Sequence, residues 1–512
     1  MTINVFSQFE IFLTADEAFP ALETLFLEAN QSVSAGFRIF DPETRLRSEE
    51  GKKVGNTWAD LITATLNRNV RIDLKISDFD PVVRTQLHAY TGRCIRGIRA
   101  AGQASTNPTK LNVTAMMHPA RVGLLPRLVL WPRLIKEINN QLSHLNGLAE
   151  TEQKQFLEDA PALQKLIYKK GDHYVARKFP PPPLVPVSHH QKLAVFDRQR
   201  LYIGGLDLND RRFDTLAHDR PTSETWHDTQ VLVDGPIAAE AAEHLEELFA
   251  ATAGQTPKKT QHLLRTLSQK RRFEMPYLSP QICVTELSTK HHESAAKAQK
   301  LIYLETQFFR DSAFAERLAE QATKNPALTL ILILPAAPED IAFDPSYGSD
   351  AAYGEHLQVK AIKVLQDGFG SRCFVGAPCK PTTSTETGRH IHFDAPLIYL
   401  HAKVSIFDDR SAIVSSANLN GRSLFWDTEA GVEIDHPAHV NELKKRCFDH
   451  WLGLNADQAA YASETACDAW ANIAARNAGK RPEDRSGFIL PYSAAVAAED
   501  ARVLPGVPEE MV

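Results

Sequence analysis

Two stretches of the chain share one succession of hydrophobic patterns. Residues 19–41, FPALETLFLEANQSVSAGFRIFD, show a helical period of apolar positions and then a short apolar strand. Residues 294–310, SAAKAQKLIYLETQFFR, show the same succession. The run LTLILILPAA at 328–337 is far shorter than the roughly 20 residues that cross a bilayer, and we expect a buried strand there. Alternating helices and strands of this kind predict an α/β protein.

A long internal repeat extends this parallel. HQKLAVFDRQRLYIGGLDLNDR at 190–211 aligns without gaps with HAKVSIFDDRSAIVSSANLNGR at 401–422. Downstream, WHDTQVLVDGP at 226–236 resembles WDTEAGVEIDHP at 426–437, and a helical stretch follows each. The period is too long for a solenoid and indicates a duplicated domain. We therefore expect duplicated α-β-α sandwich lobes, each with a mixed central β-sheet flanked by helices.

The remaining segments complete the predicted organisation. A basic stretch at 257–277 is interpreted as a solvated linker helix, with a surface that attracts anionic headgroups as the alternative. Loops at 178–186 and 379–396 precede the two repeats and are candidates for a substrate entrance. The predicted parts are an N-terminal lobe (1–255), an inter-lobe linker (256–276), a C-terminal lobe (277–455), and a helical appendage with a tail (456–512).

Composition narrows the class of protein. The 512 residues are 43% hydrophobic and 23% charged, with a formal net charge of −6, as in ordinary soluble proteins and unlike dedicated nucleic-acid binders. The N-terminus lacks early basic residues and is not a Sec signal peptide. We expect a monomer that is cytoplasmic or peripheral to a membrane, with export without a Sec signal left open and no transmembrane segment.

Metal and disulfide chemistry find little support in the sequence. The six cysteines have no CxxC spacing and are expected to be reduced thiols. His390 and His392 stand two apart in GRHIHFD and are interpreted as loop residues near a polar entrance rather than as ligands. No metal and no cofactor are expected.

The repeated motif places two kinds of side chain on one strand face. The residues after each histidine, LAVF and VSIF, are strand formers, and side chains two apart share a face of a strand. His190 and Lys192 should therefore point the same way, as should His401 and Lys403. Asp197 and Asp408 stand an odd number of residues from the lysines, and we assign them a structural role.

One histidine and one lysine do not suffice for covalent displacement at phosphorus. That reaction needs a neutral imidazole as nucleophile and a second, protonated group for the leaving oxygen. Histidine can supply both forms near neutral pH, and lysines can stabilise the phosphoryl oxygens. We therefore expect the two motifs to face each other across the lobe interface and form one site.

These motifs resemble the signature of the phospholipase D superfamily, HxKxxxxD followed by a Gly/Ser pair and Asn. The flanks are similar too: GGLDLNDRRFDT and ETWHDTQVLVDGP resemble the first-motif surroundings of phospholipases D proper, and IYLETQFF at 302–309 resembles a stretch of the eukaryotic-type enzymes. The likeness covers roughly residues 8–455 and is closest to a compact bacterial-type phospholipase D. Asp207, where Asn is frequent, and Ser415, in place of Gly, depart from the family pattern.

The resemblance implies roles for particular residues. His190 would attack phosphorus and form a phosphohistidine, and His401 would protonate the departing alcohol, although their assignment is less certain than their pairing. Asp228 and Glu429 match acids that orient the catalytic imidazoles. Lys192 and Lys403 would bind phosphate oxygens together with Asn418, while structural or supporting roles fall to Asp197, Asp408, Asp207, Asn209 and Asn420.

The function that follows is hydrolysis of glycerophospholipids to phosphatidic acid and a headgroup alcohol, or transfer of the phosphatidyl group to another alcohol. The substrate would be met at a membrane surface by a peripheral protein. The alternatives are a phosphatidyltransferase of cardiolipin-synthase type and a nuclease of the same superfamily; the acidic net charge weighs against nucleic acid. A catalytically silent phospholipid-binding protein is a third class, which the intact motifs disfavour.

Overall fold

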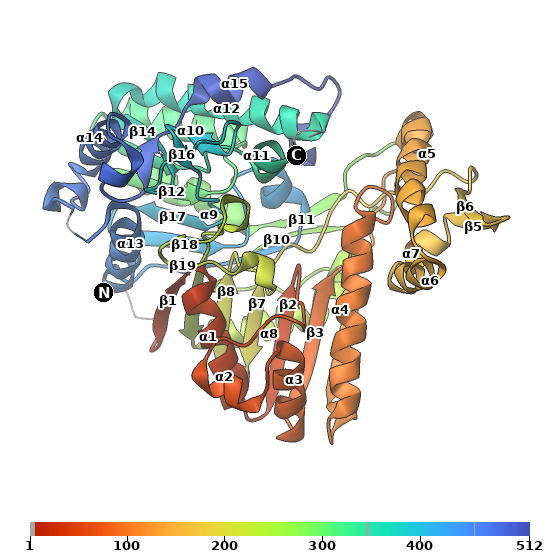
Figure 1. The fold of residues 1–512 in the computed structure, drawn as a ribbon. Helices are drawn as coiled ribbons and strands as arrows, with labels where there is room; N and C mark the ends of the chain where they lie inside the picture. The colour runs from red at the N-terminus through yellow and green to blue at the C-terminus, as the bar shows by residue number, and fades with distance from the viewer. Residues whose placement is uncertain (1–5, 345–347, 455) are drawn as a thin grey trace.

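Two mixed β-sheets with a shared strand order form the centre of the molecule (Figure 1). The computed structural model describes residues 6–344, 348–454 and 456–512. In the first sheet the order β9-β8-β7-β2-β3-β4 matches, strand for strand, the order β19-β18-β17-β12-β13-β14 in the second. In both sheets, β2/β3/β4 and β12/β13/β14 pair in parallel, and the other members of these series pair antiparallel. The expected duplicated α/β fold is confirmed.

The strands of each sheet are rich in Val, Ile and Leu, as expected where helices cover both faces. The first sheet comprises β1 (Phe9–Leu13), β2 (Ser32–Phe37), β3 (Arg71–Ser77), β4 (Leu111–Met116), β7 (Leu193–Phe196), β8 (Arg200–Gly204) and β9 (Thr229–Asp234). The second comprises β10 (Leu263–Gln269), β11 (Gln281–Thr285), β12 (Leu301–Thr306), β13 (Thr329–Ile333), β14 (Cys373–Pro378), β17 (Lys403–Phe407), β18 (Ser411–Ser415), β19 (Glu429–Ile434) and β20 (Ile489–Pro491).

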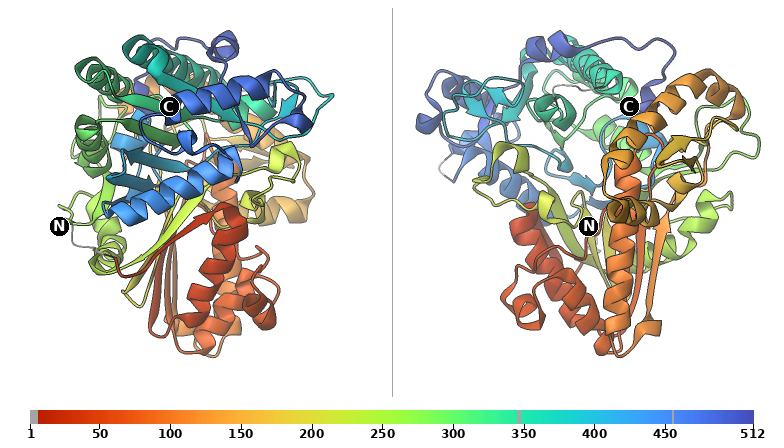
Figure 2. Two further views of the ribbon diagram at one scale, coloured as in Figure 1. Left: turned by 90° about the vertical axis from the view of Figure 1, so that its left-hand side faces the viewer. Right: turned by 45° about the vertical axis from the view of Figure 1, so that its right-hand side comes forward.

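Helices cover the outer faces of both sheets, and two more lie between the sheets (Figures 1 and 2). The outer helices of the first sheet are α1 (Thr14–Glu28), α2 (Glu49–Val54), α3 (Trp58–Asn67) and α4 (Thr85–Ala104). Those of the second are α9 (Glu286–Lys297), α10 (Ser312–Lys324) and α12 (Ser349–Phe369), whereas α11 (Glu339–Phe343) packs through Ala342 in the hydrophobic cluster of the first sheet. The inner pair is α8 (Pro236–Thr252) and α13 (Pro437–Leu452), and the C-terminal region adds α14 (Ala466–Ala478) and α15 (Ala494–Asp500).

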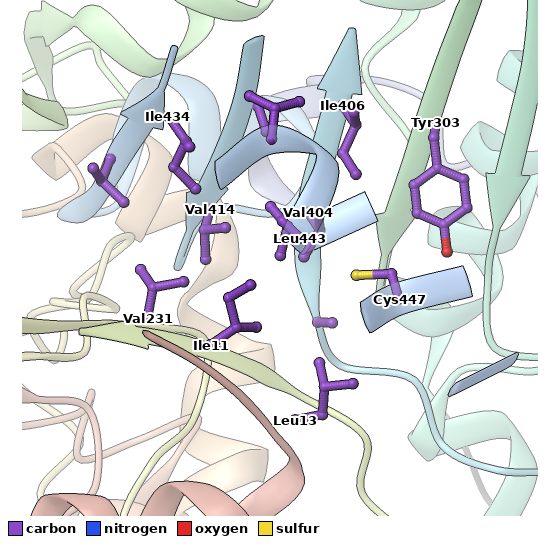
Figure 3. Packing of buried hydrophobic residues seen from close by; sticks show 14 of the residues in the cluster. Ile11, Leu13, Val231, Tyr303, Val404, Ile406, Val414, Ile434, Leu443 and Cys447 are labelled. Atoms are coloured by element: carbon purple, nitrogen blue, oxygen red, sulfur yellow. The ribbon is translucent and has the colours of Figure 1, made fainter. Parts of the chain in front are cut away.

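One hydrophobic core joins the two sheets. Figure 3 shows side chains of the first sheet, such as Ile11 and Val231, close to Val414 of the second sheet and Leu443 of α13. All of them are buried. Because burial of each such side chain contributes about 1.5–3 kcal/mol, this shared core holds the two sheets together as well as filling each half.

The segment expected as a solvated linker helix is instead part of the second sheet. Residues 263–269 form β10, which pairs with β19 as β1 pairs with β9. The expectation of a solvated helix here is wrong, because the basic residue Arg265 is buried in a strand instead of lying in solvent. Its guanidinium donates to Glu286 and to the Lys258 carbonyl, so a charged residue occupies an interior strand.

The C-terminal region contributes to the same sheet. The segment expected as an appendage contains β20, which pairs with β14 through Ile489, Leu490 and Pro491. Asn477 in α14 donates to the carbonyl of Ile489 at 3.1 Å, which ties the helix to this edge strand.

A small projection interrupts the first half. It contains α5 (Leu124–Gly147), α6 (Glu150–Asp159), α7 (Pro161–Gln164) and the hairpin β5 (Ile167–Lys170)/β6 (His173–Ala176), and the right-hand view of Figure 2 brings it forward. A second short hairpin, β15 (Ile391–His392)/β16 (Ala395–Pro396), lies in the loop before the second motif. Among the described residues, no helix is long and apolar enough to cross a membrane.

Candidate active site

The two repeated motifs lie just before two equivalent strands. His190 and Lys192 precede β7, and His401 precedes β17, which begins at Lys403, so the strands start later than the sequence pattern predicts. Each lysine ammonium donates to the backbone carbonyl of the histidine in its own motif, and this distance is 2.5 Å for Lys192. This contact keeps the lysine close to its histidine.

Each histidine bonds to a carboxylate that comes from the other half of the molecule. His401 Nδ1 lies 2.6 Å from Asp228 Oδ2, directly before β9 of the first sheet. His190 Nδ1 lies 2.8 Å from Glu429 Oε1, at the start of β19 of the second sheet. This crossed pairing brings all four predicted residues to one interface. A carboxylate that accepts from Nδ1–H leaves the Nε2 lone pair free for chemistry.

Backbone hydrogen bonds support the crossed pairs. The His190 amide donates to the Thr428 carbonyl at 2.8 Å, and the His401 amide donates to the His227 carbonyl at 2.7 Å. Thr428 and His227 immediately precede Glu429 and Asp228 in the chain. Each histidine is therefore fixed through both its backbone and its ring to the same segment of the opposite half.

Burial determines the titration of these groups. It lowers the pKa of His190 and of His401 well below the usual value, with the nearby lysines adding to the effect. Burial also raises the pKa of Asp228 to about 6 and that of Glu429 to about 8. Both imidazoles are therefore neutral near neutral pH, which is the form a nucleophile requires.

The two lysines are buried cations with weak compensation. Lys192 is fully buried, and its ammonium lies 3.9 Å from Asp207 Oδ2. Burial lowers the pKa of Lys403 to about 7, against the opposing effect of Asp228. Asp207 also accepts the Ile39 amide at 2.9 Å, so its carboxylate joins the Lys192 environment to the loop after β2. An anion placed between the lysines would relieve this uncompensated charge.

Three arginines that the sequence analysis did not single out add to the positive charge. Arg38 and Arg422 lower the pKa of His190 electrostatically, after burial and Lys192, and Arg212 acts in the same way on His401. Arg212 lies over the Trp226 ring at 3.5 Å, and its Nε and Nη1 have no hydrogen-bond partner within the described residues. Of the three, only Arg422 had a signal in the repeat, where it aligns with Arg211; Arg212 and Arg38 had none.

The predicted asparagines occupy different positions. Asn418 donates to Gln307 Oε1 at 3.2 Å, while its own amide oxygen is buried without a partner in the described part of the chain. Asn209 and Asn420 instead stabilise the turns that follow the motifs: the side chain of Asn209 accepts the Arg212 amide, and that of Asn420 accepts the Ser423 amide. Asn418 is the member of this set that retains free hydrogen-bonding capacity.

The motif aspartates lie away from the catalytic pairs. Asp197 accepts the backbone N–H groups of residues 30–32, at the entry to β2. Asp408 accepts those of residues 299–301, at the entry to β12. Each also adopts a positive φ, 53° and 54°, at the turn that follows its strand. These contacts support the structural role expected for both.

Other sequence candidates lie outside this arrangement. His390 contacts Glu386 at 2.9 Å, and His392 contacts the Pro491 carbonyl at 2.8 Å. His189, beside His190, is buried, and its Nδ1 lies 2.9 Å from Thr428 Oγ1. All six cysteines are free thiols, and all six belong to the described residues.

Comparison with known proteins gives one consistent family. A family model described as "Cardiolipin synthase, PLD-like domain" matches residues 293–451. Phospholipase D1 of Mus musculus is 23% identical over 327 residues, which cover 49% of this chain and 30% of that protein. Phospholipase D2 of Bos taurus is 25% identical, covering 52% of this chain and 36% of its own length. Phospholipase D alpha 1 of Cynara cardunculus is 20% identical, and the match covers 62% of this chain and 56% of that protein.

The chain thus spans less than two thirds of the length of these curated relatives. Among solved structures, phosphatidylserine synthase of Haemophilus influenzae Rd KW20 shares the fold, with a TM-score of 0.50, 13% identity, and 86% of each chain covered. The repeated strand order, the paired motifs and these matches all point to the phospholipase D superfamily, with a PLD-like domain matched at residues 293–451.

Proposed function

We propose that this protein cleaves the headgroup phosphodiester of glycerophospholipids, releasing phosphatidic acid and an alcohol through a phosphohistidine intermediate. The crossed pairing of His190 with Glu429 and of His401 with Asp228 carries this proposal. It provides two similar imidazoles, each oriented by a carboxylate, beside two buried lysines. Such an arrangement suits a two-step displacement at phosphorus.

In the first step, the His190 Nε2 lone pair forms a bond to phosphorus while the bond from phosphorus to the headgroup oxygen breaks. His401, protonated in the complex, gives its Nε2 proton to that oxygen. The bound phosphodiester anion and Asp228 both favour the protonated form of His401. As positive charge develops on the His190 ring, it favours the ionised form of Glu429, and the resulting carboxylate accepts from Nδ1–H and stabilises that charge.

In the second step, His401 takes a proton from water, whose oxygen forms a bond to phosphorus as the bond from nitrogen to phosphorus breaks. His190 returns to its neutral form, and phosphatidic acid leaves. Lys192 and Lys403 bind the non-bridging oxygens, and Asn418 contributes its amide. Because these cations are already in place and poorly solvated, they stabilise the transition state with little reorganisation.

An exposed apolar surface favours a lipid substrate. The Gly123 amide donates to the Tyr277 carbonyl and the Leu125 amide to the Met275 carbonyl, which joins the start of α5 to the loop after β10. Trp131 Nε1 donates to the Lys178 carbonyl, which joins the proline-rich loop at 178–186 to α5. Together these segments expose a set of large hydrophobic side chains, here called the apolar rim: Leu124, Leu125, Leu128, Val129, Phe179, Phe273 and Met275.

The loop that carries Phe179 of the apolar rim leads along the chain to the first motif. Val187, three residues before His190, packs with Ala120 and Trp426 in one small cluster. The same segments expose Arg133, Lys136 and Arg272, which would attract an anionic lipid surface. Apolar side chains flanked by basic residues suit a peripheral protein that meets its substrate at a membrane.

Transfer to an alcohol is the second candidate. The matching family model is described as a cardiolipin synthase domain, and the fold neighbour is a phosphatidylserine synthase, so an alcohol as the acceptor agrees with both. The same phosphohistidine serves both outcomes, and the acceptor that reaches His401 decides between them.

Mass spectrometry of products from mixed phospholipid vesicles, with and without ethanol, tests the proposal. Phosphatidic acid alone supports hydrolysis, and phosphatidylethanol in the presence of ethanol supports transfer. Intact lipids together with cleaved oligonucleotides in a parallel assay would contradict both and identify a nuclease. His190→Ala provides the matched control and should form none of these products.

A further inference from the structure

Three histidines outside the phosphoryl chemistry lie together where the two halves meet. One ring nitrogen from each of His218, His227 and His450 lies within 4.8 Å of the others. His218 and His227 belong to the segment between β8 and β9, whereas His450 lies near the end of α13. The cluster therefore draws ligand-type nitrogens from both halves of the molecule.

The ring of His227 is buried without partners. Its side chain is 1% exposed, and neither ring nitrogen forms a hydrogen bond within the described residues. His218 Nε2 and His450 Nε2 lie 3.0 Å apart. Two nitrogens bound to one tetrahedral Zn²⁺ would be about 3.3 Å apart, given bonds of about 2.0–2.1 Å. Two members already have nearly that separation, and movements of about 1 Å would bring in the third.

A carboxylate oxygen lies beside one member of the cluster. Glu305 in β12 is buried, and its Oε1 accepts from Tyr303 Oη at 2.5 Å and from Trp451 Nε1 at 3.0 Å. Its Oε2 lies 3.7 Å from His227 Nε2 and has no hydrogen-bond partner in the described chain. A separation of 3.7 Å is longer than a hydrogen bond and close to that of two donors on one metal ion.

A second carboxylate orients one of the rings. Asp214 Oδ2 lies 2.6 Å from His218 Nδ1 and accepts the Trp226 amide at 2.7 Å. Both Asp214 and His218 are fully buried. Such a carboxylate fixes the proton on Nδ1 and presents the Nε2 lone pair, as the supporting groups of metal-bound histidines do.

We propose that His218, His227 and His450 bind one transition-metal dication of the Zn²⁺ class, and that the Glu305 carboxylate is drawn in as the fourth donor when the ion binds. Imidazole nitrogens with one carboxylate suit zinc better than the all-oxygen sites preferred by magnesium or calcium. Four protein donors leave no open coordination position, so the ion has a structural role. It does not take part in phosphoryl transfer, and the site is independent of the proposed function.

The ion would connect the two halves beside the crossed pairs. His227 immediately precedes Asp228, its amide donates to the Tyr399 carbonyl at 2.9 Å, and its carbonyl accepts the His401 amide. Holding the His227 side chain would therefore fix the backbone on which Asp228 and His401 meet. Loss of the ion should loosen the interface between the halves before it affects either sheet.

Metal titration of the full-length protein tests this site. Protein stripped with EDTA and desalted is titrated with Zn²⁺ and, separately, with Co²⁺, and the bound ions are counted by elemental mass spectrometry. We expect one ion per chain, a rise in Tm, and the intense visible absorption of tetrahedral Co²⁺. Asp214→Asn should weaken binding roughly 10- to 100-fold. His450→Gln should abolish both the bound ion and the Tm rise.

His390→Gln is the matched control, because His390 lies outside the cluster and its ring nitrogen pairs with the solvent-exposed Glu386, so this variant should bind the ion like the wild type. Zinc bound equally well by the wild type and His450→Gln would overturn the proposal, as would a stripped wild type that binds no zinc. Should His450→Gln fail to fold, the Co²⁺ spectrum of the wild type decides, and a weak octahedral spectrum would contradict the site.

Discussion

At the scale of single residues, the crossed histidine–carboxylate pairs are the central feature. The gap-free repeat aligns His190 with His401, and the separate downstream similarity aligns Asp228 with Glu429, but neither states which acid contacts which histidine. The sequence therefore predicted the four residues correctly as a group that meets. The exchange of carboxylates between halves depends on how the sheets pack, which no local pattern records.

The crossed pairing predicts a defined kinetic effect for Asp228→Asn. The amide cannot stabilise a protonated His401, so kcat should fall roughly 10²- to 10⁴-fold while KM changes little. Vesicle assays with a phospholipid substrate provide both constants. Glu433→Gln removes a carboxylate of β19 that pairs with Lys290 on the surface, and it should behave like the wild type. Equal losses in the two variants would contradict the assigned role.

Glu429→Gln should change the pH dependence of stability as well as activity. Burial raises the pKa of Glu429 from the ordinary 4.5 to about 8, so the folded carboxyl keeps a proton that the unfolded one loses. This favourable contribution is full below about pH 4.5, declines as the pH rises, and is gone above about pH 8. Glutamine does not titrate, so the Glu429→Gln variant does not lose this contribution to stability as the pH rises.

The Tm of Glu429→Gln relative to wild type should therefore rise between pH 5 and pH 8, even though turnover is lost. Differential scanning fluorimetry across this range measures the difference. A Tm difference that stays constant with pH, or falls, would show that Glu429 is not held protonated by burial.

At the scale of elements, buried strands were predicted more readily than their exact limits. The stretch LTLILIL, which contains β13, could be predicted as a buried strand because all its residues except Thr329 are apolar. β10 was missed because LLRTLSQ contains an arginine, two hydroxyl residues and a glutamine, yet Glu286 neutralises that arginine inside the fold. A partner 21 residues away in sequence decides its burial, and composition alone does not reveal it.

The apolar rim also belongs to this scale. Phe179→Asp places a charge on a side chain that is 76% exposed, so folding should be unaffected. Activity on vesicles should fall at least roughly tenfold, since a carboxylate opposes both insertion and attraction to anionic lipid. Turnover of a short-chain phospholipid below its micelle concentration should persist.

Phe249→Asp on α8 is the matched control, because this phenylalanine is 63% exposed and lies outside the rim. It should keep activity on both substrates. A parallel loss on the monomeric substrate in Phe179→Asp would show that the substitution damages the site itself, and the membrane role of the rim would then be rejected.

At the scale of the whole molecule, duplication explains why one active site needs two lobes. The gap-free repeat predicted the α/β duplication and the meeting of both motifs at an interface. The projection at α5–α7 and the histidine cluster were not predicted, because neither has a counterpart in the other half or a motif spacing. His218, His227 and His450 become neighbours only when α13 packs between the sheets.

The central claim is that one histidine takes the phosphoryl group while its counterpart handles the proton, and trapping the intermediate tests it most directly. In His401→Asn, a phosphatidyl ester of p-nitrophenol still has a good leaving group, so His190 should be phosphorylated. Water cannot be activated, so the intermediate should accumulate. Peptide mass spectrometry should then find the phosphatidyl adduct on His190, with one p-nitrophenolate released per chain. Release without any adduct, or an adduct on another residue, would contradict the account.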